Sequence, residues 1–215
     1  LNVLKKTENE NTAKKTKTTK TIHGIEKQTT KETADQIQQG IAKEILRFHV
    51  LANSDSEEDQ KLKLEVKDRL VDYMKDILDG AEDVKETKKR ITENQETICL
   101  VAEQEIQKQG YTYPVSVNLE KCYFPMKTYG DCTFPAGTYE ALRVCIGKAK
   151  GRNWWCVLYP GLCFADSVNV IVPDEKKQEL KNILTEEEYE SLFDWREDDY
   201  QIRSGFLRLW RKLFA

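Results

Sequence analysis

The hydrophobic pattern of the chain begins with one short apolar run and continues with helical periodicity. Residues 44–52 are dense in apolar side chains and end at the polar Asn53, which predicts a buried strand. Ser54 and Glu57 then have the spacing of a helix-capping box. Apolar residues follow on one helical face before Gly80, namely Leu62, Val66, Leu70, Tyr73, Met74 and Ile77. We expect a second helix over residues 82–109.

The period changes to two after Tyr113, which indicates strands. Val115, Val117 and Leu119 alternate with polar residues. Residues 140–146 and 153–158 also have strand character, and the short loop between them predicts an antiparallel hairpin. We therefore expect an α+β fold with two layers, in which helices cover one face of a small mixed or antiparallel sheet.

The two ends of the chain differ in composition from the middle. Residues 1–40 are rich in Lys, Thr, Glu and Gln, which predicts a flexible polar spacer. The domain itself is expected over 41–172, and a C-terminal helical extension over 173–215. That extension contains a capping box at Thr185 and Glu188. Its last residues, 204–215, predict a basic amphipathic helix that either docks on the core or contacts a membrane surface.

Charge and cysteine content exclude several classes of protein. A net charge of -3 with 33% charged residues does not indicate a nucleic-acid binder. The sequence has no apolar run long enough to cross a membrane. The six cysteines include no C-x-x-C pair and only two histidines accompany them, so we expect no metal site and no cofactor. The chain begins at Leu1 rather than methionine, so we expect a signal peptide or anchor to have been removed.

The run from 152 to 164 concentrates aromatic residues and cysteines. Trp154 and Trp155 either anchor a core or fill a pocket on a partner. Cys156 and Cys163 flank a Pro-Gly turn and are a candidate disulfide for an exported protein, with Cys122 and Cys132 as a second pairing. The alternative is that these cysteines are buried free thiols.

His49 raises an enzymatic alternative. It lies in the first predicted strand, with Asn53 and Asp55 at the strand's end, and together with Cys156 or Cys163 it would make a Cys-His-Asp hydrolase site. Asn53 to Asp55 already have a structural role at the helix N-terminus. No nucleophile-elbow or paired-carboxylate spacing accompanies the histidine, so a structural histidine is favoured over a catalytic one.

Two unusual strings resemble motifs of the stage II sporulation protein R family. The first covers residues 47–55, RFHVLANSD, and the second runs from FPAGTYEALRV at 134–144 to NWWCVLYPGLCF at 153–164. The resemblance implies a signalling protein without enzymatic activity, exported from the forespore into the space between the two membranes. Its partner would be a membrane-embedded aspartic protease of the mother cell, which processes a sigma-factor precursor.

The candidate residues for binding the partner all lie within these two strings. The candidate partner-binding residues are His49, Asn53, Asp55, Arg143, Trp154 and Trp155. A cell-envelope hydrolase with a Cys/His site and a peptidoglycan-binding module, whose tryptophans stack on sugar rings, are the competing interpretations.

Overall fold

The computed structural model describes residues 34–164 and 171–193. Within the segment predicted as a spacer, residues 34–40 belong to a helix described over 34–44. The rest of that segment and the predicted amphipathic helix over 204–215 lie outside the described residues. No described helix is long and apolar enough to cross a membrane.

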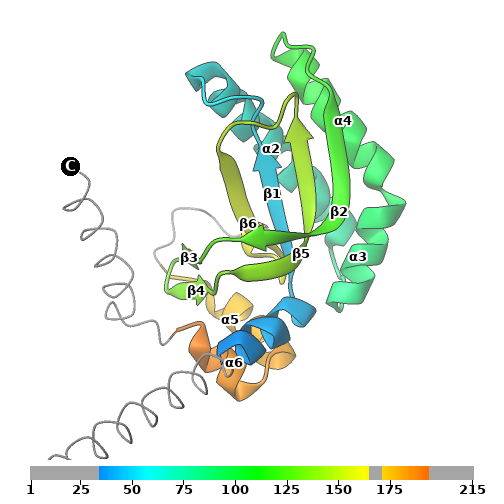
Figure 1. Cartoon of the computed structure of the whole chain (residues 1–215). Coiled ribbons are helices and arrows are strands. Elements are labelled where there is room, and N and C mark those ends of the chain that lie inside the picture. The colour runs from blue at the N-terminus through cyan, green and yellow to red at the C-terminus, as the bar shows by residue number, and fades with distance from the viewer. Residues whose placement is uncertain (1–33, 165–170, 194–215) are drawn as a thin grey trace, which may run out of the picture. The chain divides into compact units, whose positions relative to one another are not determined.

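A mixed four-stranded sheet forms the centre of the domain (Figure 1). Its strands are β2 (Val115–Phe124), β5 (Gly137–Ile146), β1 (Leu46–Leu51) and β6 (Asn153–Tyr159), in that spatial order. β1 pairs in parallel with β5 and antiparallel with β6, while β2 pairs antiparallel with β5. All residues of β1 are buried, as expected for a central strand. The α+β prediction is confirmed.

The predicted hairpin between β5 and β6 is wrong, because β1 lies between these two strands. The loop that joins them crosses the end of β1 instead of making a tight turn. There the Gly151 N–H donates to the Ala52 carbonyl at 2.9 Å, and the Lys150 N–H to the Asn53 carbonyl at 3.2 Å. Gly147 has a φ of 58°, and a Cβ at this position would collide with the Asn53 side chain. The hairpin prediction failed because local alternation does not reveal a strand inserted from far away in the sequence.

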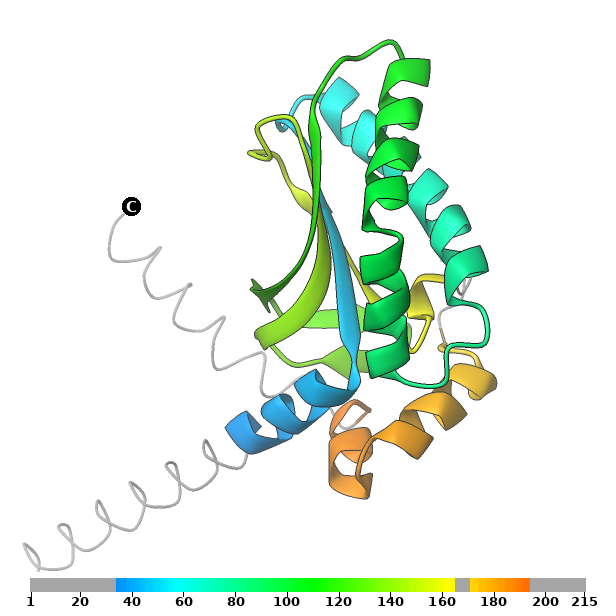
Figure 2. The ribbon, with the colours of Figure 1, turned by 90° about the vertical axis from the view of Figure 1, so that its right-hand side faces the viewer.

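Helices α2 (Glu57–Leu78), α3 (Val84–Glu93) and α4 (Gln95–Lys108) cover one face of the sheet (Figure 2). α2 begins later than the Ser54 capping box predicts. Its N-cap is Ser56, whose hydroxyl accepts from the Asp59 N–H at 3.2 Å, because Ser54 instead donates to the Asp59 carboxylate at 2.5 Å. The core between the layers is apolar and includes Phe48, Val50, Val66, Leu70, Ile98, Leu142 and Val144.

The single helix predicted over 82–109 is broken at Asn94, which ends α3 and precedes α4. The Asn94 side chain donates to the Arg90 carbonyl at 2.8 Å, and its carbonyl oxygen accepts from the Tyr73 hydroxyl at 3.2 Å. An asparagine side chain that bonds to nearby backbone competes with helix continuation. Apolar periodicity continues through the break, so the pattern alone did not locate it.

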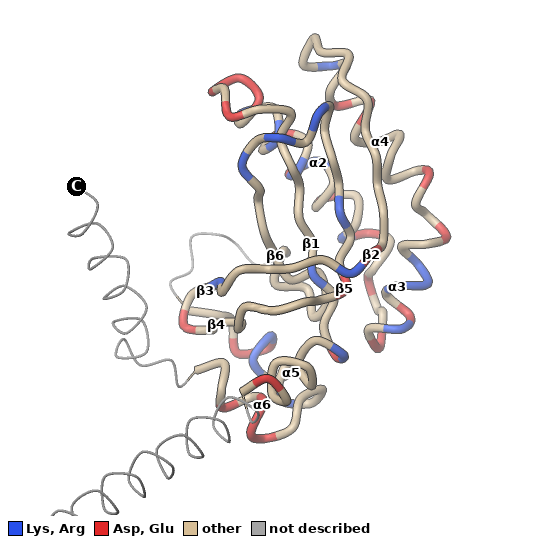
Figure 3. Tube along the Cα trace, in the orientation of Figure 1, with Lys and Arg blue, Asp and Glu red and all other residues tan. Residues whose placement is uncertain are grey.

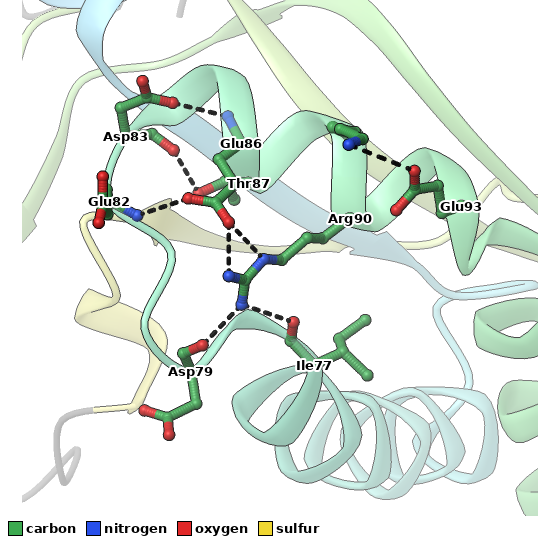
Figure 4. A network of polar contacts seen from close by, with 9 residues as sticks. Ile77, Asp79, Glu82, Asp83, Glu86, Thr87, Arg90 and Glu93 are labelled. Carbon is green, nitrogen blue, oxygen red and sulfur yellow. Dashed lines mark hydrogen bonds and ion pairs between the residues drawn. The ribbon is translucent and has the colours of Figure 1, made fainter.

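Arg90 joins the end of α2 to α3 (Figure 4). Its guanidinium donates to the Asp79 carbonyl at 2.6 Å and to the Glu86 carboxylate at 2.5 Å. Glu86 in turn accepts from the Glu82 N–H at 3.0 Å, and these bonds lower the pKa of its carboxyl. Positive and negative residues are interspersed along α3 (Figure 3), which suits a solvated helix surface.

The remaining described elements are not part of the four-stranded sheet or of the helices that cover it. β3 (Lys127–Tyr129) and β4 (Cys132–Phe134) form a two-stranded sheet, and η1 (Leu162–Phe164) follows β6. α5 (Asp174–Ile183) and α6 (Glu186–Ser191) come last, and the capping box of Thr185 and Glu188 is confirmed. The Thr133 N–H donates to the Leu192 carbonyl at 2.7 Å, which fastens this C-terminal part to β4.

Arg47 connects the two sheets. Its side chain is fully buried, and its guanidinium carbon lies 4.5 Å from the centre of the Phe124 ring and 5.2 Å from that of Phe134. Nε donates to the Cys156 carbonyl at 3.1 Å and Nη2 to the Tyr129 hydroxyl at 3.0 Å. The rings of Tyr129 and Tyr139 also lie within cation–π range, at 5.8 and 5.1 Å. We call Arg47 and the rings of Phe124, Tyr129, Phe134 and Tyr139 the arginine cage.

We expect Arg47→Ala to lower the free energy of unfolding by about 3 kcal/mol or more, because it leaves a cavity among the rings and an unpaired Cys156 carbonyl. Arg47→Met refills much of the volume and should lose about 2 kcal/mol less than the alanine variant. Urea denaturation of the two variants measures both values. Equal losses would show that filling the cage contributes nothing to stability.

Candidate partner-binding face

The face of the sheet opposite α2, α3 and α4 carries a row of three predicted site residues. In the strand registers His49 of β1 is paired with Arg143 of β5 on one side and with Trp155 of β6 on the other. Cross-strand partners point to the same face of a sheet. No described helix covers this face (Figure 2). We call this face of the sheet the open face. It comprises the row Arg143, His49 and Trp155, together with Glu120, Cys122 and Phe124 of β2.

His49 is enclosed by aromatic and sulfur groups. Its ring stacks on Trp155 with centroids 4.9 Å apart and planes at 15°, and lies 5.2 Å from the Phe124 ring. Nε2 is 3.5 Å from the Cys122 Sγ, whereas Nδ1 has no hydrogen-bond partner among the described residues. The side chain is only 3% exposed. This burial, reinforced by the positive charge of Arg143, lowers the pKa of His49 to about 4.

Arg143 and Glu120 form the charged part of the open face. Nη1 of Arg143 donates to the Glu120 carboxylate at 2.7 Å, and the two side chains are 36% and 40% exposed. The bond to Glu120 raises the pKa of Arg143. Arg143 and the half-buried Trp155 lie on either side of His49, and arginine and tryptophan are both enriched among the residues that dominate protein–protein binding energy.

Trp154 lies on the other face and does not belong to this row. Its ring packs against Phe48 in a T-shaped contact at 5.6 Å, and the Lys67 ammonium lies 5.1 Å from the ring centre. The two neighbouring tryptophans therefore point to opposite faces of β6, as period-two alternation requires. They do not form one shared platform for stacking on sugar rings.

Asn53 and Asp55 hold the loop between β5 and β6. The Asn53 side-chain oxygen accepts from the Lys148 N–H at 2.9 Å, and its amide donates to the Asp59 carboxylate at 2.8 Å. The Asp55 carboxylate accepts from the Arg152 N–H at 2.7 Å. Both residues therefore have structural partners beyond the end of β1.

Glu120 and Phe124 of the open face were not predicted from the sequence, and Cys122 was predicted only as a possible disulfide partner of Cys132. All three belong to the second half of β2, whose alternation was followed only as far as Leu119. β2 continues to Phe124 with the same register against β5, so its even-numbered residues share the face of Arg143. The period of two, continued beyond Leu119, is the signal that predicts their place.

The thiol beside His49 is not the one that the hydrolase interpretation requires. Cys156 is paired with Phe48, whose side chain packs under the helices, while His49 points to the open face. Burial raises the pKa of Cys122 to about 11. A neutral thiol beside a neutral imidazole is the opposite of an activated thiolate–imidazolium pair. Among the described residues no group of three or more His, Cys, Asp or Glu could hold a metal ion.

The architecture defines a two-layer α+β domain in which one sheet face builds the core and the other presents aromatic and charged side chains. Residues 42–169 match the family model described as stage II sporulation protein R. The chain is 33% identical over 174 residues to stage II sporulation protein R of Bacillus subtilis (strain 168), covering 79% of this chain and 76% of that protein. No solved structure matches the chain. The chain belongs to the stage II sporulation protein R family, which confirms the resemblance and gives it a role in sporulation.

The lowered pKa of His49 makes stability depend on pH. Above about pH 6.5 the imidazole is neutral in both the folded and the unfolded chain. Between pH 6.5 and about 4 only the unfolded chain takes up the proton, so the free energy of unfolding falls as the pH falls. From pH 7 to pH 5 this group should account for a loss of about 2 kcal/mol.

Denaturant titrations of the wild type and of His49→Phe at pH 7 and pH 5 check this expectation. The phenylalanine keeps an aromatic ring against Trp155 and removes the titrating group, so its stability should fall less. The same decrease in both proteins would show that the folded imidazole titrates normally.

Proposed function

We propose that this protein is exported from the forespore into the space between the two membranes, where it binds and activates a membrane-embedded aspartic protease of the mother cell. Activation would then trigger processing of a sigma-factor precursor. Membership of the sporulation family supports the cellular context. The open face supports a binding role, because it combines Trp155, Arg143 and Glu120 on a rigid sheet with no described helix over it.

The single observation that carries the binding proposal is the row of His49, Arg143 and Trp155. Its backbone is fixed by hydrogen bonding of β1 to strands on both sides, so little conformational freedom is lost when a partner docks. Trp155 is held in place by its stack on His49. The Arg143 side chain is 36% exposed and donates to Glu120 through Nη1, so the rest of its five-donor guanidinium retains capacity to donate to a receptor group.

Reconstitution tests this function directly. Purified full-length protein is added to membranes that carry the candidate protease, and cleavage of the sigma-factor precursor is followed against protein concentration. We expect Arg143→Ala to raise the half-maximal concentration by about 30-fold, the effect of losing an interface hot spot of about 2 kcal/mol. Its free energy of unfolding should fall by no more than about 1 kcal/mol, since the Glu120 ion pair is solvent-exposed.

Arg152→Ala is the matched control. It removes the same side chain from a site that is 74% exposed, in the loop beside Asp55 and away from the open face. Its dose–response curve should stay within about twofold of wild type, because exposed peripheral residues contribute little binding energy. If both arginine variants behave alike, the open face is not the contact surface.

Cys122→Ala separates the activator from a hydrolase that would use the His49–Cys122 pair. The activator should keep its activity with this variant, because a neutral thiol contributes only packing there. Loss of precursor cleavage by a folded Cys122→Ala protein that still binds the protease-bearing membranes would reopen the enzymatic interpretation.

A further inference from the structure

Two thiols converge at the edge strand β6. Cys156 lies on β6 and Cys163 on η1, and both are free thiols in the structure. The Sγ of Cys163 lies 3.1 Å from the Val157 carbonyl oxygen, and the Sγ of Cys156 lies 3.8 Å from the same oxygen. Two thiols that both lie within about 4 Å of one carbonyl oxygen are neighbours that a rotation of their side chains can bring to bonding distance.

The surroundings of this pair are shielded and already ordered. Cys156 is 4% exposed, and Cys163 packs against the core cluster beneath the helices. The intervening chain turns at Pro160 and Gly161, and the Leu162 N–H donates to the Pro160 carbonyl at 2.6 Å. The backbone is therefore already folded back in the way that a cross-link between 156 and 163 requires.

The other described cysteines have different neighbours. Cys99 contacts the Val115 carbonyl at 3.7 Å, and Cys122 contacts His49. The pairing of Cys122 with Cys132 has no thiol–thiol contact among the described residues, since Cys132 is buried in the β3–β4 sheet. The shared Val157 carbonyl thus singles out Cys156 and Cys163.

We propose that Cys156 and Cys163 form a disulfide when the chain meets an oxidising compartment, which rests on the export proposed above. The oxidant is a disulfide, either a small molecule or a protein. One thiolate attacks it to form a mixed disulfide, and the second thiolate displaces the remaining thiol. An S–S bond forms between Cys156 and Cys163, two protons and two electrons leave them, and the oxidant is reduced to two thiols.

The timing of this reaction follows from burial. Burial raises the pKa of Cys163 well above that of an exposed thiol, so little thiolate is present in the folded protein. Exchange is therefore slow once the domain has folded, and the bond forms during folding. In the finished disulfide the Cys156 sulfur is shielded from reductants, because Cys156 is buried.

The cross-link has a structural effect on the open face. It fastens β6 to η1 on the side of the sheet that faces the helices, one residue from Trp155 on the opposite face. β6 is an edge strand with a single described strand neighbour, so it has more freedom to move than β1. The disulfide would limit that movement and keep Trp155 in position.

Refolding in a redox buffer tests the proposal. Full-length protein is refolded from denaturant in a mixture of reduced and oxidised glutathione, denatured again and alkylated. We expect four alkyl groups instead of six, a mass 2 Da lower before alkylation, and a peptide that links 156 to 163. Reduction should lower the melting temperature by about 5–10 °C, the stabilisation expected for a short closed loop in a domain of this size.

Cys99→Ser is the matched control and should keep the linked peptide and the redox-dependent melting temperature. Cys163→Ser should lose both. Six alkylated thiols in the refolded wild type, or a linked peptide that joins other cysteines, would overturn the proposal even if a serine variant failed to fold. The measurement needs no protease, so a failure of activation with the disulfide present would count only against the proposed function.

Discussion

The packing of the four-stranded sheet against the β3–β4 sheet depends on one buried guanidinium, that of Arg47, which has no carboxylate beside it among the described residues. Removing a full positive charge from water is costly, and the described residues give Arg47 no ion-pair partner. The cost is offset by four aromatic rings, a backbone carbonyl and a phenol hydroxyl. These groups come from β2, β3, β4, β5 and β6, so a single side chain of β1 brings together nearly every strand of the molecule.

The same strand determines the geometry of the open face. The register between β1 and β6 shifts between Leu46 and Arg47, beside the point where Arg47 Nε donates to the Cys156 carbonyl. Beyond the shift the register is regular, and His49 meets Trp155. Phe124 contacts the Arg47 guanidinium, the His49 ring and the Trp155 ring. The cage and the open face are therefore one continuous cluster, in which the buried arginine packs against Phe124 and Phe124 supports the half-buried Trp155.

How far the sequence predicts this structure depends on whether a feature is local. The strand before Asn53, the helix after it and the Thr185 capping box rest on neighbouring residues and were predicted. The insertion of β1 between β5 and β6 depends on pairing across the whole domain, and no local period encodes it. The break at Asn94 was hidden because the apolar stripe runs through it. Of the site, His49, Arg143 and Trp155 were named beforehand, but their alignment in one row and the departure of Trp154 to the core required the register.

The central position of β1 has a consequence for the order in which the domain can assemble. β1 comes first among the strands, yet its hydrogen-bonding neighbours are the last two strands of the same sheet, and Arg47 contacts a carbonyl 109 residues later. A chain emerging from its N-terminus thus exposes its fully buried central strand, with at least one edge unpaired, until residue 159 is available. Synthesis that stops short of β6 leaves an aggregation-prone fragment rather than a smaller folded domain, so the sheet is completed only when its last strand arrives.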